Sequence, residues 1–177
     1  MFAKRIIPRL DVTEGRLDKG SPRAEELATA DPVELARFYE AAGADELLFT
    51  DQAVSTDRAA LMQQLIDQVA REVFVPIMVS GGIGSLAQIR SLLRVGVDRV
   101  VLQSAALQDP AFLAEAVRRF GPERIVVGIR TRRVTADGVS EEEAAGLSPR
   151  ELAERSVVLV QRGTKPSGRT VADWGRE

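Results

Sequence analysis

Short apolar runs alternate with longer amphipathic stretches along most of the chain. Five of these runs have the length and the β-branched or apolar composition of buried strands. The stretches between them repeat apolar residues at helical spacing, and such an alternation is typical of βα units that build a parallel sheet. The pattern predicts strands over residues 4–11, 46–51, 76–80, 99–103 and 124–130.

Capping residues mark where the helices begin. Asp31 precedes Pro32, and Glu34 follows within the first turn; this places an N-cap, a proline at N1 and an acidic residue where a helix start favours them. Asp109 with Pro110 and Ser148 with Pro149 repeat the arrangement. The predicted sheet-covering faces of the first two helices consist of Leu35, Phe38, Tyr39 and Ala42, and of Leu61, Leu65, Ile66 and Val69.

An internal repeat supports this interpretation. Gly43-Ala44-Asp45 and Gly96-Val97-Asp98 each precede a predicted strand, and each glycine suits the C′ position that ends a helix. Two successive βαβα quarters form half of a (βα)8 barrel, which typically needs about 250 residues, whereas this chain has 177. We therefore expect an α/β fold of the (βα)4 half-barrel type, with a fifth strand and a C-terminal helix, completed by dimerisation.

The predicted domain organisation has three parts. Residues 1–133 form the half-barrel domain, and residues 134–163 form an acidic loop followed by an additional helix over 149–162. Residues 164–177 have little apolar content, so we expect a disordered tail there.

Composition narrows the chemistry. The chain has 24 basic and 26 acidic residues, so its net charge of −2 gives no reason to expect nucleic acid as a partner. It lacks both His and Cys, which removes disulfides, the commonest general base and the usual zinc ligands, and we expect neither a metal nor a cofactor. No apolar run of about 18 residues and no leader pattern is present, so we expect a cytoplasmic protein without a membrane span.

The strongest candidate site is a glycine cluster. Gly81 and Gly82 directly follow a predicted strand and precede a helix, where backbone amides and the helix N-terminus favour an anion such as phosphate. A tight strand-to-helix turn would use the same residues. Gln103 and Ser104 follow the next strand and are candidates for the same anion, although Ser104 would equally suit a helix N-cap.

Charged residues are expected at both ends of the sheet. Asp11 and Asp51 end the first two strands, at the edge where barrel enzymes keep their catalytic groups, and Lys19 lies in the first loop. Solvated acidic side chains and a solvated loop lysine are the alternatives. At the other end we expect Arg5, Glu46 and Arg99 to form an ion-pair cluster.

Six short motifs together resemble a known family. They are Ala3-Lys4-Arg5-Ile6-Ile7, Leu10-Asp11-Val12, Asp31-Pro32-Val33-Glu34-Leu35, Asp45-Glu46-Leu47, Gly81-Gly82-Ile83 and Val126-Val127. From residue 1 to about residue 133 the chain is similar to the histidine-biosynthesis (βα)8 barrels, in particular to the cyclase subunit of imidazole glycerol phosphate synthase. The resemblance implies that Asp11 is a general acid or base for ring closure and that Lys19 and Asp51 contact the substrate. It also implies a phosphate site at Gly81, Gly82, Gln103 and Ser104.

The chain departs from the family pattern at two points in the site. Arg130 stands where the family has its second catalytic Asp. Arg9 stands where the family has a cysteine, and the arginine can pair with Asp11. An arginine cannot accept a proton, so a mechanism with two carboxylates cannot run in its family form. The family's second phosphate site lies on later strands, and we expect neither efficient cyclase activity nor a glutaminase partner.

Three functional hypotheses follow from these residues. The chain is a binding module for phosphate or a sugar phosphate, a self-associating scaffold, or a weak lyase that uses Asp11. We rank the first two above the third and expect a homodimer, because a half-barrel would expose apolar and unpaired sheet surface.

Overall fold

The protein is described by a computed structural model. The described residues are 4–18, 31–52, 58–133, 156–160, 165–170 and 172. The chain divides into two compact units, Met1–Val126 and Val127–Glu177. Each unit is described separately below.

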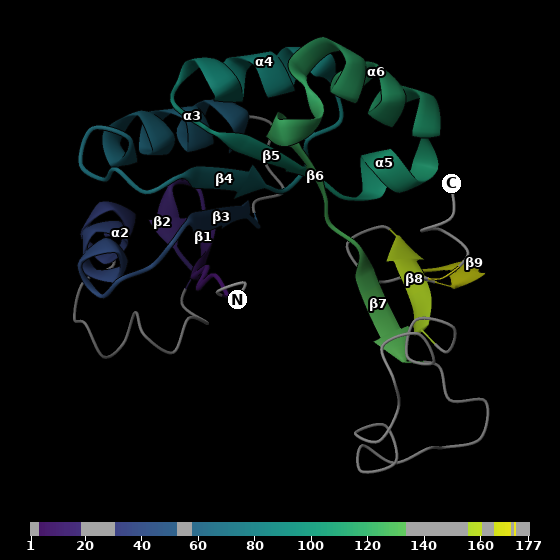
Figure 1. Cartoon of the computed structure of the whole chain (residues 1–177), viewed down its shortest axis with the longest axis horizontal. Helices are drawn as coiled ribbons and strands as arrows, with labels where there is room; N and C mark the ends of the chain where they lie inside the picture. The colour runs from purple at the N-terminus through teal and green to yellow at the C-terminus, as the bar shows by residue number, and fades with distance from the viewer. Residues whose placement is uncertain are drawn as a thin grey trace. The chain divides into compact units, whose positions relative to one another are not determined.

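The first unit is built on a six-stranded sheet with the order β2-β1-β3-β4-β5-β6 (Figure 1). The strands β1, β3, β4 and β5 pair in parallel, while the short β2 folds back antiparallel onto β1. This order, in which parallel neighbours follow one another along the chain, is consistent with the predicted half-barrel. The strands are β1 (Arg9–Thr13), β2 (Arg16–Leu17), β3 (Leu47–Asp51), β4 (Ile77–Ser80), β5 (Arg99–Leu102) and β6 (Ile125–Val127).

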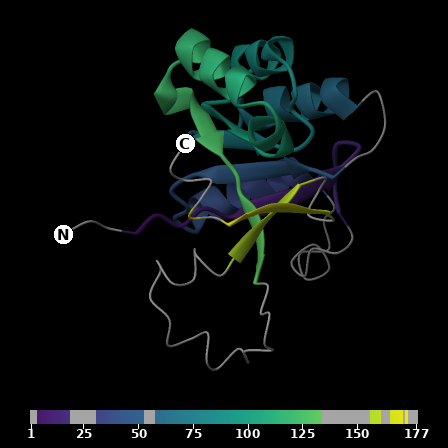
Figure 2. The same ribbon diagram turned by 90° about the vertical axis from the view of Figure 1, so that its right-hand side faces the viewer.

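Helices connect the parallel strands, so the predicted α/β fold is confirmed. Figures 1 and 2 show α3 and α4 along one face of the sheet, and α3 contacts both α2 and α4. The helices are α2 (Pro32–Ala41), α3 (Arg58–Val69), α4 (Leu86–Arg94), α5 (Ser104–Gln108) and α6 (Pro110–Phe120), followed by the 3-10 turn η1 (Pro122–Arg124).

The predicted caps form where they can be observed. Asp31 is the N-cap of α2 and accepts a hydrogen bond from the Val33 N–H at 2.8 Å. Asp109 does the same for α6 through the Phe112 N–H at 3.0 Å. The third predicted cap, at Ser148 and Pro149, lies outside the described residues.

The core lies between the sheet and its helices. In the parallel register, Leu10, Phe49, Val79 and Val100 stand side by side on one face, and all four are almost completely buried. We call this the helix face, because Val79 lines a small space together with residues of α3 and α4. Side chains alternate along a strand, so the residues between these four point to the opposite face.

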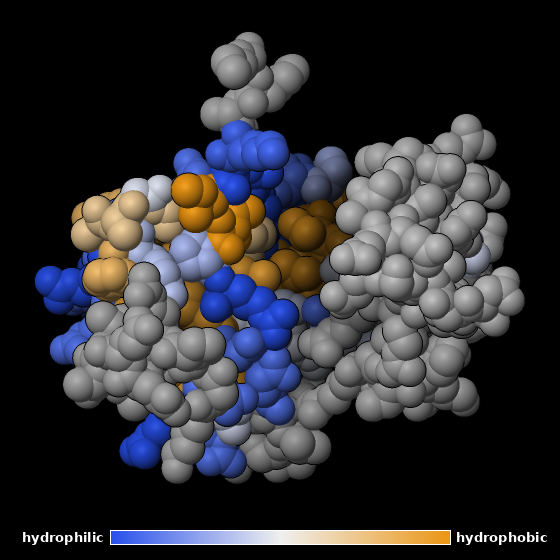
Figure 3. Space-filling model, turned by 90° about the horizontal axis from the view of Figure 1, so that it is seen from below, coloured by the Kyte–Doolittle hydropathy of each residue, from blue (hydrophilic) through white to orange (hydrophobic). Residues whose placement is uncertain are grey.

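The first helix buries a different stripe from the one predicted. Leu35 is buried as expected, but Phe38 is 42% exposed and Ala42 is exposed, while Ala36 is buried in their place. Phe38 instead contacts the Tyr39 ring edge to face, with centroids 5.7 Å apart. The face seen in Figure 3 shows apolar surface next to charged surface.

The first strand starts later than predicted. Residues 4–8 are not part of the regular strand, which begins at Arg9 after Pro8 and runs to Thr13, so Asp11 lies within the strand and not at its predicted end. Proline has no N–H to donate to a strand ladder, although the Pro8 carbonyl still accepts from the Leu48 N–H at 2.9 Å.

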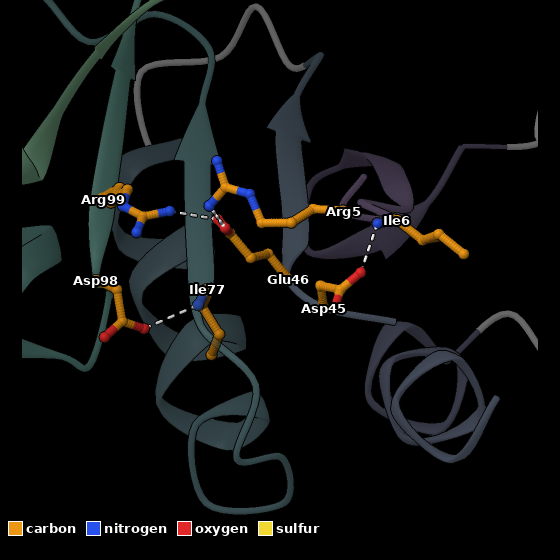
Figure 4. A network of polar contacts seen from close by, with 7 residues as sticks. All are labelled: Arg5, Ile6, Asp45, Glu46, Ile77, Asp98 and Arg99. Carbon is orange, nitrogen blue, oxygen red and sulfur yellow. Dashed lines mark hydrogen bonds and ion pairs between the residues drawn. The ribbon is translucent and has the colours of Figure 1, made fainter. Parts of the chain in front are cut away.

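The internal repeat corresponds to a repeated structural device. Gly43 and Gly96 both have positive φ, of 89° and 104°, and follow the last residues of α2 and α4 as predicted. The aspartate two residues after each glycine makes two hydrogen bonds to the backbone of one residue earlier in the chain, a pair that we call the Asp bracket. Asp45 forms it with Ile6, and Asp98 forms it with Ile77 (Figure 4). In both copies the Asp N–H donates to the carbonyl at 2.9 Å and the carboxylate accepts from the N–H of the same residue.

The second unit corrects the prediction for the C-terminal part. Its described strands β7 (Arg130–Arg133), β8 (Ser156–Val160) and β9 (Lys165–Thr170) form an antiparallel sheet in that order. The helix predicted over 149–162 is therefore wrong over 156–160, where three valines favour a strand once β7 and β9 offer partners. The tail predicted to be disordered contains β9, and the strand predicted over 124–130 ends at Val127.

The two aspartates allow the contribution of the Asp bracket to the free energy of unfolding to be measured at two positions. We expect Asp98→Ala to lower the free energy of unfolding by about 1 kcal/mol, because it leaves the Ile77 N–H without its charged acceptor. Asp45→Ala should cost less, because its hydrogen bond is exposed to water, whereas the one to Ile77 is partly buried. Urea unfolding of both variants tests this, and an equal or larger loss for Asp45→Ala would contradict it.

Candidate functional site

Polar side chains gather on one face of the sheet at the carboxyl ends of its strands. The register pairs Asp11 with Thr50, Thr50 with Ser80, and Ser80 with Val101. These residues alternate with the helix-face residues, so they stand in a row on the opposite face. The carboxyl edge of a parallel sheet is where α/β proteins bind their ligands. The candidate site is the row of Asp11, Thr50 and Ser80 together with the turn that follows β4.

Asp11 is held by two neighbours. Arg9, two residues earlier on the same strand face, donates to Asp11 Oδ1 from Nε at 2.9 Å and from Nη2 at 2.7 Å, and Nη2 also reaches Oδ2 at 2.9 Å. The Gln52 amide donates to Oδ1 at 2.9 Å from the end of β3. The ion pair predicted between Arg9 and Asp11 is thereby confirmed, and Oδ1 accepts three hydrogen bonds.

Ser80 lies in the same row and is almost completely buried, with 1% of its surface exposed. Within the described part of the chain, its Oγ is the buried side-chain polar atom that has no hydrogen-bond partner. Thr50 beside it is also buried. The next residues after Ser80 are the two glycines of the turn.

Gly81 and Gly82 both have positive φ, of 107° and 60°, a conformation that favours glycine. Gly81 is also pressed against the backbone of Asp51: a Cβ added there would collide with the Asp51 carbonyl oxygen and lie 2.9 Å from its nitrogen. The turn then enters α4 through the N-cap Ser85. Gln88 Oε1 accepts from the Gly84 N–H at 3.0 Å and so holds the end of the turn against the helix.

Asp51 faces away from Asp11. It pairs with Val12, whose side chain belongs to the helix face, and it lines a pocket there together with Gly81, Gly82 and Gln88. The structure therefore separates the two aspartates that the sequence places at the same edge.

Gln103 and Ser104 follow β5 at the same edge. Gln103, not Ser104, is the N-cap of α5, and its side chain makes no capping hydrogen bond. Ser104 is the first helical residue, so the interpretation of Ser104 as an N-cap is wrong. Both side chains are partly exposed.

Two predicted site residues cannot be placed. Lys19 lies outside the described residues, and of Arg130 only the backbone, at the start of β7, is described. Within the described residues, no group of three acidic side chains could hold a metal ion. No helix among them is long and apolar enough to cross a membrane.

The other end of the sheet carries the predicted ion-pair cluster. The Glu46 side chain is 4% exposed and accepts hydrogen bonds from Arg5 and from Arg99 Nη1, the latter at 2.5 Å (Figure 4). Arg99 begins β5 and Glu46 directly precedes β3, whereas Arg5 lies four residues before β1 begins, so the cluster forms at the predicted amino end of the sheet. The cluster thus lies at the opposite end of the sheet from Asp11.

The sequence did not single out Gln52 or the orphan hydroxyl of Ser80. Gln52 directly follows a predicted strand end, which is the same signal that singled out Asp11 and Asp51. The sequence places Ser80 at the end of a predicted strand and within the glycine-rich loop of residues 79–84, without assigning its hydroxyl a role. Its position on the face of Asp11 follows from alternation, but the lack of a partner for its hydroxyl depends on the packed structure.

The parallel βα arrangement and the polar carboxyl edge define a protein of the barrel-related α/β class. The model of one family, described as "Histidine biosynthesis protein", matches residues 5–177. The chain belongs to this family. The match also extends through the antiparallel second unit, beyond the residue near 133 where the recognised motifs end.

The close approach of Gly81 to Asp51 can be tested by adding one methyl group. Gly81→Ala should lower the free energy of unfolding by about 2–4 kcal/mol, because the backbone is in a region unfavourable for alanine and the new Cβ meets the Asp51 backbone. Gly43→Ala has a positive φ but open space, so about 1 kcal/mol is expected. Gly84→Ala has neither constraint and should stay within about 0.5 kcal/mol of wild type. Denaturant unfolding that ranks Gly81→Ala with Gly84→Ala would contradict this.

Proposed function

We propose that this protein binds a phosphorylated small molecule, of the sugar-phosphate class, at the carboxyl edge of its sheet. The phosphate group would lie at the turn formed by Gly81 and Gly82, near the N-terminus of α4, and the rest of the ligand over the row of Asp11, Thr50 and Ser80. The observation that carries the proposal is the register, which places this polar row directly before the glycine turn. Helix N-termini and glycine backbones are suited to bind anions.

Family membership is consistent with this ligand class. We infer that the chain is related to the cyclase subunit of imidazole glycerol phosphate synthase, on the motifs that carry the resemblance. Gln103 and Ser104 follow β5 at the same edge and would supply further polar contacts to the phosphate. Lys19, from the first loop, is the proposed cationic contact to the ligand.

The geometry around Asp11 favours binding over ring closure. An effective general base needs a free lone pair directed at the proton it removes. Here Oδ1 already accepts from Arg9 and Gln52, and the guanidinium also reaches Oδ2. In the sequence, Arg130 stands where the resemblance would place the second carboxylate for acid and base catalysis. We therefore place the weak lyase below the binding module.

Inorganic phosphate provides the direct test. A ligand that binds only the folded state stabilises it, by about 1.4 kcal/mol at ten times the dissociation constant, which is roughly 3–6 °C in melting temperature for a domain of this size. We expect this shift in wild type and its loss in Gly82→Asp, which puts a negative charge into the turn. The matched control is Gly43→Asp, which also changes a glycine of positive φ but at the other end of the sheet.

The control separates loss of binding from loss of folding. If Gly82→Asp retains the phosphate shift while folding normally, the turn is not the anion site. If wild type shows no shift with millimolar inorganic phosphate or ribose 5-phosphate, the binding function is wrong and the scaffold hypothesis remains.

We further propose that the protein forms a homodimer. Ile6 is 65% exposed and Phe74 is 96% exposed, and both lie near the amino ends of strands, at the end opposite Asp11. Apolar side chains exposed to this degree are favourable to bury in an interface. Association at the amino ends would leave the carboxyl edge accessible to a ligand.

Light scattering across a concentration series tests the association. The expected mass is about twice that of one chain, and the double variant Ile6→Ser with Phe74→Ser should shift the protein toward the monomer. Phe38→Ser, which changes an exposed aromatic residue on α2, is the comparison. A wild-type protein that remains monomeric at high concentration would exclude the dimer.

A further inference from the structure

The hydroxyl of Ser80 is an exception among the buried polar groups. Most buried polar atoms in folded proteins have a hydrogen-bond partner, and leaving one without a partner costs about 1–3 kcal/mol. Ser80 Oγ has no such partner in the described part of the chain, although the residue is 99% buried. A buried polar group that lowers the stability of the free protein is explained if a bound ligand supplies its hydrogen-bond partner.

The place of Ser80 in the sheet supplies that reason. It is the last residue of β4, between Thr50 of β3 and Val101 of β5, and the glycine turn begins at the next residue. Its neighbour Val79 faces the helices and lines the small pocket there, so Ser80 points to the opposite face, which also carries Asp11. The orphan hydroxyl thus lies between the proposed phosphate position and the residues around Asp11.

We propose that Ser80 Oγ is a ligand-binding group that hydrogen-bonds the hydroxyl or ether oxygen next to the phosphate of a sugar phosphate. This assignment rests on the proposed function and adds a residue that distinguishes a sugar phosphate from phosphate alone. A serine hydroxyl both donates and accepts, so it matches either kind of sugar oxygen. Thr50 lies beside it in the row and helps to shape the same surface.

Because Ser80 is almost completely buried, the contact requires the groups that cover Oγ to move when the ligand binds. Serine has one side-chain torsion, and rotation to another staggered position moves Oγ without moving the backbone. Among the described residues no hydrogen bond holds the hydroxyl, so its rotation breaks none with them. Binding then gives the hydroxyl its partner.

The test compares two probes in two variants. Ser80→Ala should weaken ribose 5-phosphate binding about fivefold to tenfold in isothermal titration calorimetry and leave inorganic phosphate within about twofold. Without ligand, Ser80→Ala should melt at the same temperature as wild type or higher, because it removes an unpaired polar group. Ser91→Ala, which removes a partly buried hydroxyl from α4, is the control and should change neither affinity.

Each other outcome overturns the assignment in a recognisable way. If wild type binds phosphate in a manner that depends on Gly82 but Ser80→Ala binds ribose 5-phosphate normally, the proposed function holds and the role of Ser80 is wrong. An equal loss for both probes would place the hydroxyl on the phosphate rather than on the sugar. A clearly lower melting temperature with unchanged affinities would make Ser80 an internal structural group. If wild type binds neither probe, both proposals are wrong.

Discussion

The parallel pairing of β1, β3 and β4 determines every feature of the candidate site. Leu10, Phe49 and Val79 share the helix face, and this forces Asp11, Thr50 and Ser80 together onto the other face. A slip of one residue in β1 would exchange its two faces and turn the Asp11 carboxylate toward the helices. The apolar contacts that secure the core therefore also align the polar row, and the Asp brackets at Ile6 and Ile77 hold the amino ends of the strands in the same register.

Much of this arrangement follows from local signals in the sequence. The caps at Asp31 and Asp109 and the helix-ending glycines at 43 and 96 depend on a few adjacent residues, and they form as predicted. The helix predicted in the C-terminal part is wrong for the opposite reason. The segment 156–160 has the composition of a strand, but its strand state depends on partners more than twenty residues away in β7, whereas the cap-like Ser148 and Pro149 favour a helix locally.

In the candidate site too, some features follow from the local sequence and others depend on the pairing between strands. Alternation along β1 predicts that Arg9 and Asp11 share a face, and their ion pair follows. The contact of Gln52 with Asp11, the turning of Asp51 toward the helices and the orphan state of Ser80 all depend on the pairing between strands. Sequence patterns find the residues at the edge of the sheet, but only the register tells which of them meet.

The glycine turn has a structural explanation at one of its two glycines. Gly81 is explained by packing alone, since the Asp51 backbone leaves no room for a side chain. This was the alternative interpretation of the cluster, and it holds for that position. It does not account for the unpaired hydroxyl before the turn or for the ion pair of Arg9 with Asp11, a pair whose opposite charges largely cancel. An edge in which the carboxylate is neutralised by its own neighbour repels an incoming phosphate less than a free aspartate would, because the repulsion falls with the local net charge. Under the proposed function, the pairing of Arg9 with Asp11 therefore makes this edge more favourable for an anion than an unpaired aspartate would.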